Sequence, residues 1–249
     1  MIKAGIDIGA KNIKIVIMKD SEILAKGVFL SGIDIKVFIN EIFNKVLKDA
    51  NLSKENISQI IVTGVGTDLI PFATNKISIV SAIAKTANFY FPESKMVIDV
   101  GAEETRIVKC NKGAVLDFAL NDKCAAGAGL FLEAISRALE VSLEEMGRLS
   151  LKTENTVPIN TQCVIFAESE VVSLIHRKTP KGDIARSVYD SMASRVYSLA
   201  SKLGIEQNTV VVGGVAKDIG FLDSLKRKLG VNLLVPDNPE FAGAIGACL

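Results

Sequence analysis

The sequence predicts an α/β protein built from two similar domains, and two observations support this fold class. First, the chain opens twice on the same plan: an apolar strand, the triplet Asp-x-Gly, a short polar turn and a second apolar strand. Asp7 and Asp99 begin the two triplets, and each is followed seven residues later by a basic residue, Lys14 or Arg106. Second, strand-like runs alternate with helical patterns along the rest of the chain, as in sheets covered by helices. A repeat of such long period indicates two domains of one fold rather than a solenoid.

The first domain is expected to cover residues 1–93. Residues 3–30 contain apolar runs of strand length, with the first turn at residues 9–12. In the stretch 34–51, apolar residues recur at steps of three and four, which predicts a helix with one buried face. The other predicted elements are a short buried strand that ends in a glycine turn, at residues 57–66, and a helix, at residues 77–91.

The second domain is expected to cover residues 94–249 and to open with the strand–turn–strand plan at 96–120. Helical spacing then predicts three helices, at residues 127–140, 164–178 and 183–203. The remaining predicted elements are a strand that runs into a Gly-Gly turn (208–216), a helix (217–229), a strand (232–236) and a last helix (243–249). We expect this last helix to be able to pack back on the first domain.

Composition narrows the class of protein. Hydrophobic residues make up 49% of the 249 residues and charged residues 23%, which predicts a globular protein with a substantial core. The net charge of +1 gives no reason to expect a nucleic acid or a membrane surface as partner. Apolar runs are broken by Lys76 and Lys85 before they reach the length of a membrane span, and the first residues lack the layout of a signal peptide. We therefore expect a cytoplasmic protein.

Glycine turns follow three predicted strands and point to nucleotide binding. Glycine lets backbone N–H groups approach a phosphate without a Cβ in the way. A carboxylate beside a polyphosphate repels it unless Mg²⁺ lies between them, so Asp7 and Asp99 are predicted Mg²⁺ ligands, directly or through water. The Gly213-Gly214 turn, at a helix start, suits the adenosine and α-phosphate end. The predicted nucleotide-binding residues are Gly9, Ala10, Lys11, Asn12, Lys14, Gly101, Ala102, Gly127, Gly129, Gly213, Gly214, Val215 and Lys217.

A single Asp-x-Gly after a strand is usually an ordinary turn, but two copies in matched contexts followed by a Gly-Gly junction favour the nucleotide interpretation. The sequence contains neither a GxxxxGK[ST] loop nor a GxGxxG turn after a strand. In order and spacing, the three turns resemble the phosphate-1, phosphate-2 and adenosine motifs of the superfamily that includes actin, hexokinase and heat-shock chaperones. This resemblance implies two ribonuclease-H-like lobes with an ATP cleft between them.

Of the four cysteines, Cys124 and Cys163 each stand just before a predicted helix. Free N–H groups and the dipole at a helix start lower a thiol's pKa and stabilise an anionic cluster. A [4Fe–4S] cluster needs four thiolates, so a twofold dimer would have to donate two from each copy. Buried filler is nevertheless the commoner role of a cysteine in an apolar α/β protein, and it is the simplest one for Cys110 and Cys248.

The segments around these cysteines, NDKCAAGAGLFLE (121–133) and QCVIFAESEVVSLIHRKTPKGDIARSV (162–188), resemble the cysteine motifs of a known group. This group contains the ATP-dependent activators of 2-hydroxyacyl-CoA dehydratases and the ATPase subunits of benzoyl-CoA reductases, and the likeness extends over essentially the whole chain. It implies that Cys124 and Cys163 of two subunits hold one [4Fe–4S] cluster. It further implies a homodimer that binds and hydrolyses MgATP, accepts electrons from ferredoxin or flavodoxin, and passes them to a dehydratase-like iron–sulfur enzyme.

The sequence departs from this group at several positions. The hydroxyl residue after the first Asp-x-Gly is replaced in Ala10-Lys11-Asn12. Where the group has Gly-Gln-Asp after the second triplet, this chain has Ala102-Glu103-Glu104. Glu103 therefore stands where a glutamine of the group would orient the attacking water. The segment 64–67 lacks an arginine that many members of the group carry. After the first cysteine, Ala-Gly-Leu at residues 128–130 replaces the Thr-Gly-Arg of the group. We expect Asp7, Asp99 and Glu103 to be the catalytic residues. The negative charge of Glu103 leaves the rate of ATP hydrolysis an open question.

Two alternatives stay open. A small-molecule (sugar) kinase of the same fold would need a catalytic aspartate, for which Asp117 and Asp122 are the available residues. A nucleotide-binding regulator without turnover would fit the changes at Ala10 and Glu103. The lone histidine, His176, is expected at the surface. The basic residues Arg177, Lys178, Lys181 and Arg186 are expected on a charged surface, with attraction of an acidic partner as the alternative.

Overall fold

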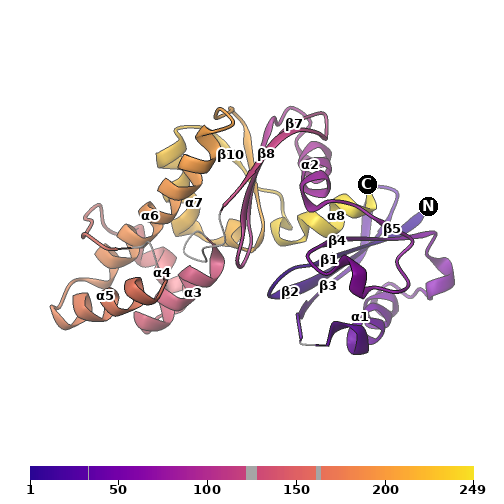
Figure 1. Ribbon diagram of the computed structural model, residues 1–249, viewed down its shortest axis with the longest axis horizontal. Coiled ribbons are helices and arrows are strands. Elements are labelled where there is room, and N and C mark those ends of the chain that lie inside the picture. The colour runs from indigo at the N-terminus through magenta and orange to yellow at the C-terminus, as the bar shows by residue number, and fades with distance from the viewer. Residues whose placement is uncertain (33, 122–127, 161–163) are drawn as a thin grey trace. The chain divides into compact units, whose positions relative to one another are not determined.

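The computed structural model describes residues 1–32, 34–121, 128–160 and 164–249 (Figure 1). The chain forms two compact units. The first unit comprises Met1–Ser94, Cys110–Leu116 and Glu240–Leu249, and the second comprises Lys95–Lys109 and Asp117–Pro239. Four residues that the sequence analysis singled out lie outside the described residues: Asp122, Cys124, Gly127 and Cys163.

A five-stranded sheet forms the centre of the first unit, with the order β3-β2-β1-β4-β5. β1 pairs antiparallel with β2 and parallel with β4. Isoleucine and valine make up at least half of the residues in β2 and β4, which suits a sheet that is covered on both faces. The strands are β1 (Ile2–Ile8), β2 (Asn12–Lys19), β3 (Glu22–Leu30), β4 (Gln59–Gly64) and β5 (Asn75–Lys76).

Three helices cover this sheet: α1 (Ile35–Asp49), α2 (Ile79–Tyr90) and α8 (Ala242–Cys248). α1 turns the predicted apolar face inward and buries Phe43 among the strand residues. α8, at the end of the chain, consists largely of glycine and alanine and belongs to the first unit. A Cβ on Gly5 of β1 would come within 1.9 Å of the Ala244 carbonyl oxygen, so only glycine allows α8 to lie this close to the sheet.

The second sheet has the order β10-β9-β6-β7-β8, and most of its residues belong to the second unit. Read from its other end, this order matches that of the first sheet strand for strand, with an antiparallel β6–β7 pair and a parallel β6–β9 pair. The repeated plan in the sequence therefore folds into the same topology twice. The strands are β6 (Met96–Val100), β7 (Thr105–Asn111), β8 (Ala114–Leu120), β9 (Thr209–Val212) and β10 (Leu233–Leu234).

The helices of the second unit surround a core that contains the fully buried Tyr189 and Phe221. α4 was not predicted, although Ser142 caps it by accepting a hydrogen bond from the backbone N–H of Glu145, which is a Ser-x-x-Glu start. Within the described part of the chain, no helix combines the length and apolar character that a membrane span requires. The helices are α3 (Gly129–Ala138), α4 (Leu143–Ser150), α5 (Val164–His176), α6 (Lys181–Ser201) and α7 (Ile219–Leu229).

Short 3₁₀ turns connect several of these elements. In the second unit, Gly214–Lys217 forms such a turn between β9 and α7, where the sequence analysis had expected a Gly-Gly turn and then a helix from residue 217. Asp218 ends the turn and is the N-cap of α7. The other 3₁₀ turns are η1 (Lys54–Asn56), η2 (Thr67–Leu69) and η5 (Pro239–Phe241).

Candidate nucleotide site

Each unit places one nearly buried aspartate at the end of its central strand, opposite a basic residue. Asp7 on β1 stands in register with Lys14 on β2, and Asp99 on β6 stands in register with Arg106 on β7. Lys14 Nζ lies 3.5 Å from an Asp7 carboxylate oxygen, and Arg106 donates to Asp99 at 2.8 Å. Each carboxylate thus has a cation beside it, and carboxylate oxygens are the hard ligands that a divalent cation prefers.

A glycine with a left-handed backbone closes the end of the neighbouring parallel strand in each unit. Gly64 ends β4 with φ of +92°, and Gly213 follows β9 with φ of +89°. A Cβ on Gly64 would lie 2.3 Å from the Ile8 carbonyl oxygen, and one on Gly213 would lie 2.3 Å from that of Val100. Both conformation and space therefore require glycine. The sequence analysis recognised Gly213 but gave Gly64 no role, although both follow an apolar strand.

The turns after the two aspartates are built alike. The Gly9 N–H donates to the Asn12 carbonyl at 3.0 Å, and the Gly101 N–H donates to the Glu104 carbonyl at 2.9 Å. Ser31, which the sequence analysis missed, fixes the first turn because its hydroxyl donates to the Gly9 carbonyl at 2.8 Å. These bonds leave the tip of the first turn at the surface, where Ala10 is exposed.

The start of α3 is joined to the second turn. The N–H groups of Gly129 and Leu130 donate to the carbonyls of Gly101 and Ala102, each at 2.9 Å. A Cβ on Gly129 would lie 3.0 Å from the Val215 side chain, so the glycine brings α3 close to the Gly213–Lys217 turn. The sequence analysis expected free N–H groups at this helix start. That expectation is wrong for Gly129 and Leu130, because the turn carbonyls accept their hydrogen bonds.

The Gly213–Lys217 turn is held from both sides. The Gly213 N–H donates to the Pro239 carbonyl at 2.9 Å, and the side chain of Val215 is buried beneath the turn. A Cβ on Gly214 would meet nothing within 4 Å, so the outer surface of the turn is open. The open backbone of Gly214 and the buried side chain of Val215 suit a turn that contacts a ligand through its main chain.

The residues of the second unit fit a magnesium nucleotide. A Cβ on Gly213 would occupy the space beside the Asp99 carboxylate. The carboxylate itself is the hard oxygen ligand that Mg²⁺ prefers. Glu103 is exposed and free to face solvent, whereas Glu104 forms an ion pair with Arg106. In the first unit, Thr63 lies beside Asp7 in the sheet, and its buried hydroxyl has no hydrogen-bond partner among the described residues. A buried polar atom of this kind marks a place where a water or an ion can bind.

The described cysteines do not fit a metal centre. Burial raises the pKa of the Cys110 thiol to about 11 and that of Cys248 to about 12. Both thiols are therefore protonated near neutral pH and act as core residues. Among the residues that the structure describes, no group of three or more His, Cys, Asp or Glu side chains could hold a metal ion. An iron–sulfur cluster thus depends on Cys124 and Cys163, which lie outside the described residues.

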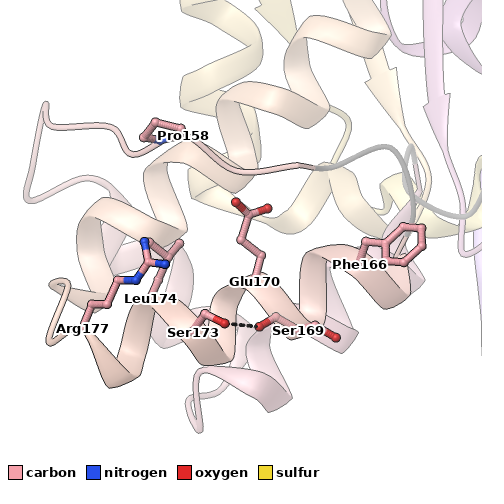
Figure 2. Close-up of a pocket in the computed structure, with 7 residues that line it drawn as sticks. All are labelled: Pro158, Phe166, Ser169, Glu170, Ser173, Leu174 and Arg177. Atoms are coloured by element: carbon pink, nitrogen blue, oxygen red, sulfur yellow. Dashed lines mark hydrogen bonds between the residues drawn. The ribbon is translucent and has the colours of Figure 1, made fainter.

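A groove of about 440 Å³ runs along α5, the helix that follows Cys163 in the sequence (Figure 2). Phe166 stands at one end of this groove and Arg177 at the other, with Glu170 between them. Ile165 and Phe166 are 70% and 65% exposed, which is unusual for large apolar side chains. This face of α5 therefore offers apolar contact surface.

Other expectations fare differently. His176 and Asp117 are exposed. Arg186 does not lie on a free charged surface: only 12% of its side chain is exposed, and it forms ion pairs with Asp190 and Asp223. The pair with Asp190 lies within α6 at i,i+4 spacing. The pair with Asp223 arises because α7 packs beside α6, which the local sequence does not reveal.

Comparisons with known proteins agree with this arrangement. The family described as the BadF/BadG/BcrA/BcrD ATPase family matches residues 4–249. The solved structure of the activator of the 2-hydroxyisocaproyl-CoA dehydratase from Clostridium difficile, with bound ADPNP, is 36% identical with a TM-score of 0.93, covering 100% of this chain and 93% of that one. One of the benzoyl-CoA reductase subunits of Thauera aromatica is 31% identical, covering 100% of this chain and 92% of the relative.

A more distant match bears on the fold alone. The ROK family glucokinase of Streptomyces griseus, solved with glucose and AMPPNP, is 13% identical with a TM-score of 0.60, covering 100% of this chain and 98% of that one. The predicted actin/hexokinase-type architecture is thereby confirmed. The similarity is too low to carry a kinase activity over to this chain.

Proposed function

The chain belongs to the BadF/BadG/BcrA/BcrD ATPase family, and from this premise we propose that it hydrolyses ATP to drive electrons into a dehydratase-like or benzoyl-CoA reductase-like partner enzyme. The observation that carries the ATPase part is the repeated arrangement of a buried aspartate, a cation and a left-handed glycine. A related structure that contains a bound ATP analogue supports the choice of nucleotide.

In this proposal, the chain's own residues bind and orient the nucleotide. The turns at Gly9–Asn12 and Gly101–Ala102, with Lys14, Gly127 and Gly129, approach the phosphates, while Gly213–Lys217 holds the adenosine end. Asp7 and Asp99 would hold Mg²⁺, directly or through water, and the bound ion would supply positive charge against the phosphates. Glu103 orients the attacking water, although its negative charge suits this task less well than a neutral amide would.

The electron-transfer part rests on Cys124 and Cys163 of two subunits. A [4Fe–4S] cluster held by these four thiolates would supply one-electron transfer at low potential. The exposed apolar residues Ile165 and Phe166, which follow Cys163 at the start of α5, support a homodimer at this face. Ferredoxin or flavodoxin is the proposed electron donor, and the cytoplasm is the proposed location.

Substitution of one cysteine tests this assignment. Cys124→Ser should abolish the bound iron and the cluster absorbance of anaerobically purified protein and weaken the dimer, while MgADP still binds. Cys110→Ser is the matched control, because Cys110 is buried on β7 and should leave the iron content unchanged. Equal iron in Cys124→Ser and wild type would refute the cluster assignment. Absence of MgADP binding to wild type would refute the nucleotide assignment separately.

A nucleotide-binding regulator without turnover is the second proposal, and it rests on Glu103. The exposed carboxylate stands where the resemblance leads us to expect a glutamine. The rate of ATP hydrolysis, measured with and without a reductant, separates the two: turnover that rises with reductant supports electron transfer, and its absence in both conditions supports the regulator.

A further inference from the structure

Tyr189, on α6, holds Asp218, the residue that follows the Gly213–Lys217 turn. Its hydroxyl donates to one carboxylate oxygen of Asp218 at 2.7 Å. The other oxygen of Asp218 accepts hydrogen bonds from the N–H groups of Gly220 and Phe221, at 2.9 and 3.1 Å. Burial raises the pKa of the Tyr189 hydroxyl, so it remains a donor at any ordinary pH. Asp218 is thus fixed by three hydrogen bonds directly after Lys217, the last residue of the turn.

The close packing around Asp218 admits no larger residues. A Cβ on Gly220 would lie 2.6 Å from the Tyr189 ring and 2.7 Å from the Ser150 hydroxyl oxygen, at the end of α4. A Cβ on Gly147 of α4 would lie 3.3 Å from the Asp218 carboxylate. Any shift of the glycine turn that moves Asp218 must therefore also move α6 or α4, because close-packed interiors do not absorb such shifts.

The same part of α6 holds a second segment, the irregular stretch 151–160 that leads toward Cys163. Ser187 Oγ accepts the Val157 N–H at 2.7 Å, and the Thr153 hydroxyl donates to Asp183 at 2.7 Å. Arg186 donates to the Thr153 carbonyl at 3.2 Å and also forms an ion pair with Asp223 of α7. The residues of α6 that make these contacts, from Asp183 to Tyr189, lie along roughly 9 Å of the helix, at about 1.5 Å per residue.

We propose that this part of α6 positions the nucleotide turn and the 151–160 segment together, with Tyr189 holding one and Asp183, Arg186 and Ser187 holding the other. The inference rests on the proposed nucleotide site. It names the residues that link this site to the segment 151–160, which precedes Cys163 in the sequence. Tyr189 touches neither nucleotide nor cluster and is a positioning residue. Nucleotide bound at Gly213–Lys217 restricts Asp218 and, through Tyr189, reduces the motion of 151–160.

Tyr189→Phe tests one end of this link, because it removes the hydroxyl and keeps the ring that packs on Gly220. We expect the Kd for MgADP, measured by calorimetry, to rise about fivefold, the value of one ordinary hydrogen bond. Hydrogen exchange of 151–160 should slow on MgADP binding in wild type, and this protection should be lost in Tyr189→Phe. Ser198→Ala is the control, since its hydroxyl bonds only within α6 and both readouts should match wild type.

Ser187→Ala tests the other end and does not disturb the turn. It should bind MgADP like wild type, whereas exchange of the Val157 amide should no longer respond to the nucleotide. An unchanged Kd in Tyr189→Phe, or protection of 151–160 that persists in both variants, would overturn the proposal. If wild type itself fails to bind MgADP, the proposed nucleotide site is wrong instead, so the two failures are distinguishable.

Discussion

Gly213 lies against Asp99 so closely that a Cβ on the glycine would be 2.6 Å from a carboxylate oxygen of the aspartate. The relation is repeated in the first unit, where a Cβ on Gly64 would lie 2.8 Å from a carboxylate oxygen of Asp7. Gly64 ends the strand that runs parallel to the Asp7 strand, and Gly213 directly follows the strand that runs parallel to the Asp99 strand. The absence of a side chain on the glycine thus leaves room for each carboxylate at the strand end.

This closeness predicts different outcomes for two adjacent glycines. Gly213→Ala should lower the free energy of unfolding by about 2 kcal/mol or more, because the new Cβ meets the Val100 carbonyl at a positive φ. Gly214→Ala should change it by less than about 1 kcal/mol, since nothing lies within 4 Å of the added atom. Urea unfolding measures both. If Gly214→Ala loses MgADP binding at normal stability, the turn contacts the nucleotide; equal destabilisation of both variants would contradict the geometry.

Removal of the Asp99 charge should impair hydrolysis more than folding. Asp99→Asn keeps the size of the side chain, and Arg106 retains its ion pair with Glu104. If Asp99 holds Mg²⁺, kcat for ATP hydrolysis should fall on the order of 100-fold, the loss of several kcal/mol of transition-state stabilisation. Asp117→Asn, at an exposed position on β8, is the control and should retain full activity. The reverse result, with Asp117 essential, would favour the kinase hypothesis.

Substitution at Glu103 should raise activity. In the proposed site, a glutamine there removes a negative charge beside the phosphates and can both donate a hydrogen bond to a water and accept one from it. Glu103→Gln should therefore increase kcat on the order of tenfold, as measured by phosphate release. Glu104→Gln should not increase it, because Glu104 is engaged by Arg106. A fall in kcat for Glu103→Gln would mean that the carboxylate itself is required, for example as a base.

Asp190 predicts an acid-dependent loss of stability. Burial alone would raise the pKa of its carboxyl, but hydrogen bonds from Arg227 and Ser224 outweigh burial and lower it. Because the folded pKa lies below the unfolded value of about 3.9, the stabilisation is complete above that value and is lost as the pH falls through the folded pKa. The stability difference between wild type and Asp190→Asn should thus shrink from pH 5 downward. A difference that stays constant with pH would exclude this titration.

Some features of the protein follow from the sequence by itself because they are local. Asp7 and Lys14 face each other because a tight turn joins two antiparallel strands, and such a turn fixes the register of all residues near it. The same holds for Asp99 and Arg106. Helical periodicity located α1, α2 and α5 within a few residues, since burial of one face repeats along the chain. The Ser142-x-x-Glu145 start of α4 is also a local signal, although the sequence analysis did not use it to predict this helix.

Other features depend on tertiary structure, because they join segments that are distant in sequence. Gly64 and Gly213 acquire equivalent roles only when β4 and β9 align beside β1 and β6, and loops of different length hide this equivalence in the chain. Arg186 belongs to the interior because α7 brings Asp223 to it. The bond from Tyr189 to Asp218 likewise forms between two helices, and no local spacing encodes it. Side-chain pairing across elements is set by how the helices pack, whereas pairing within a hairpin is set by the turn.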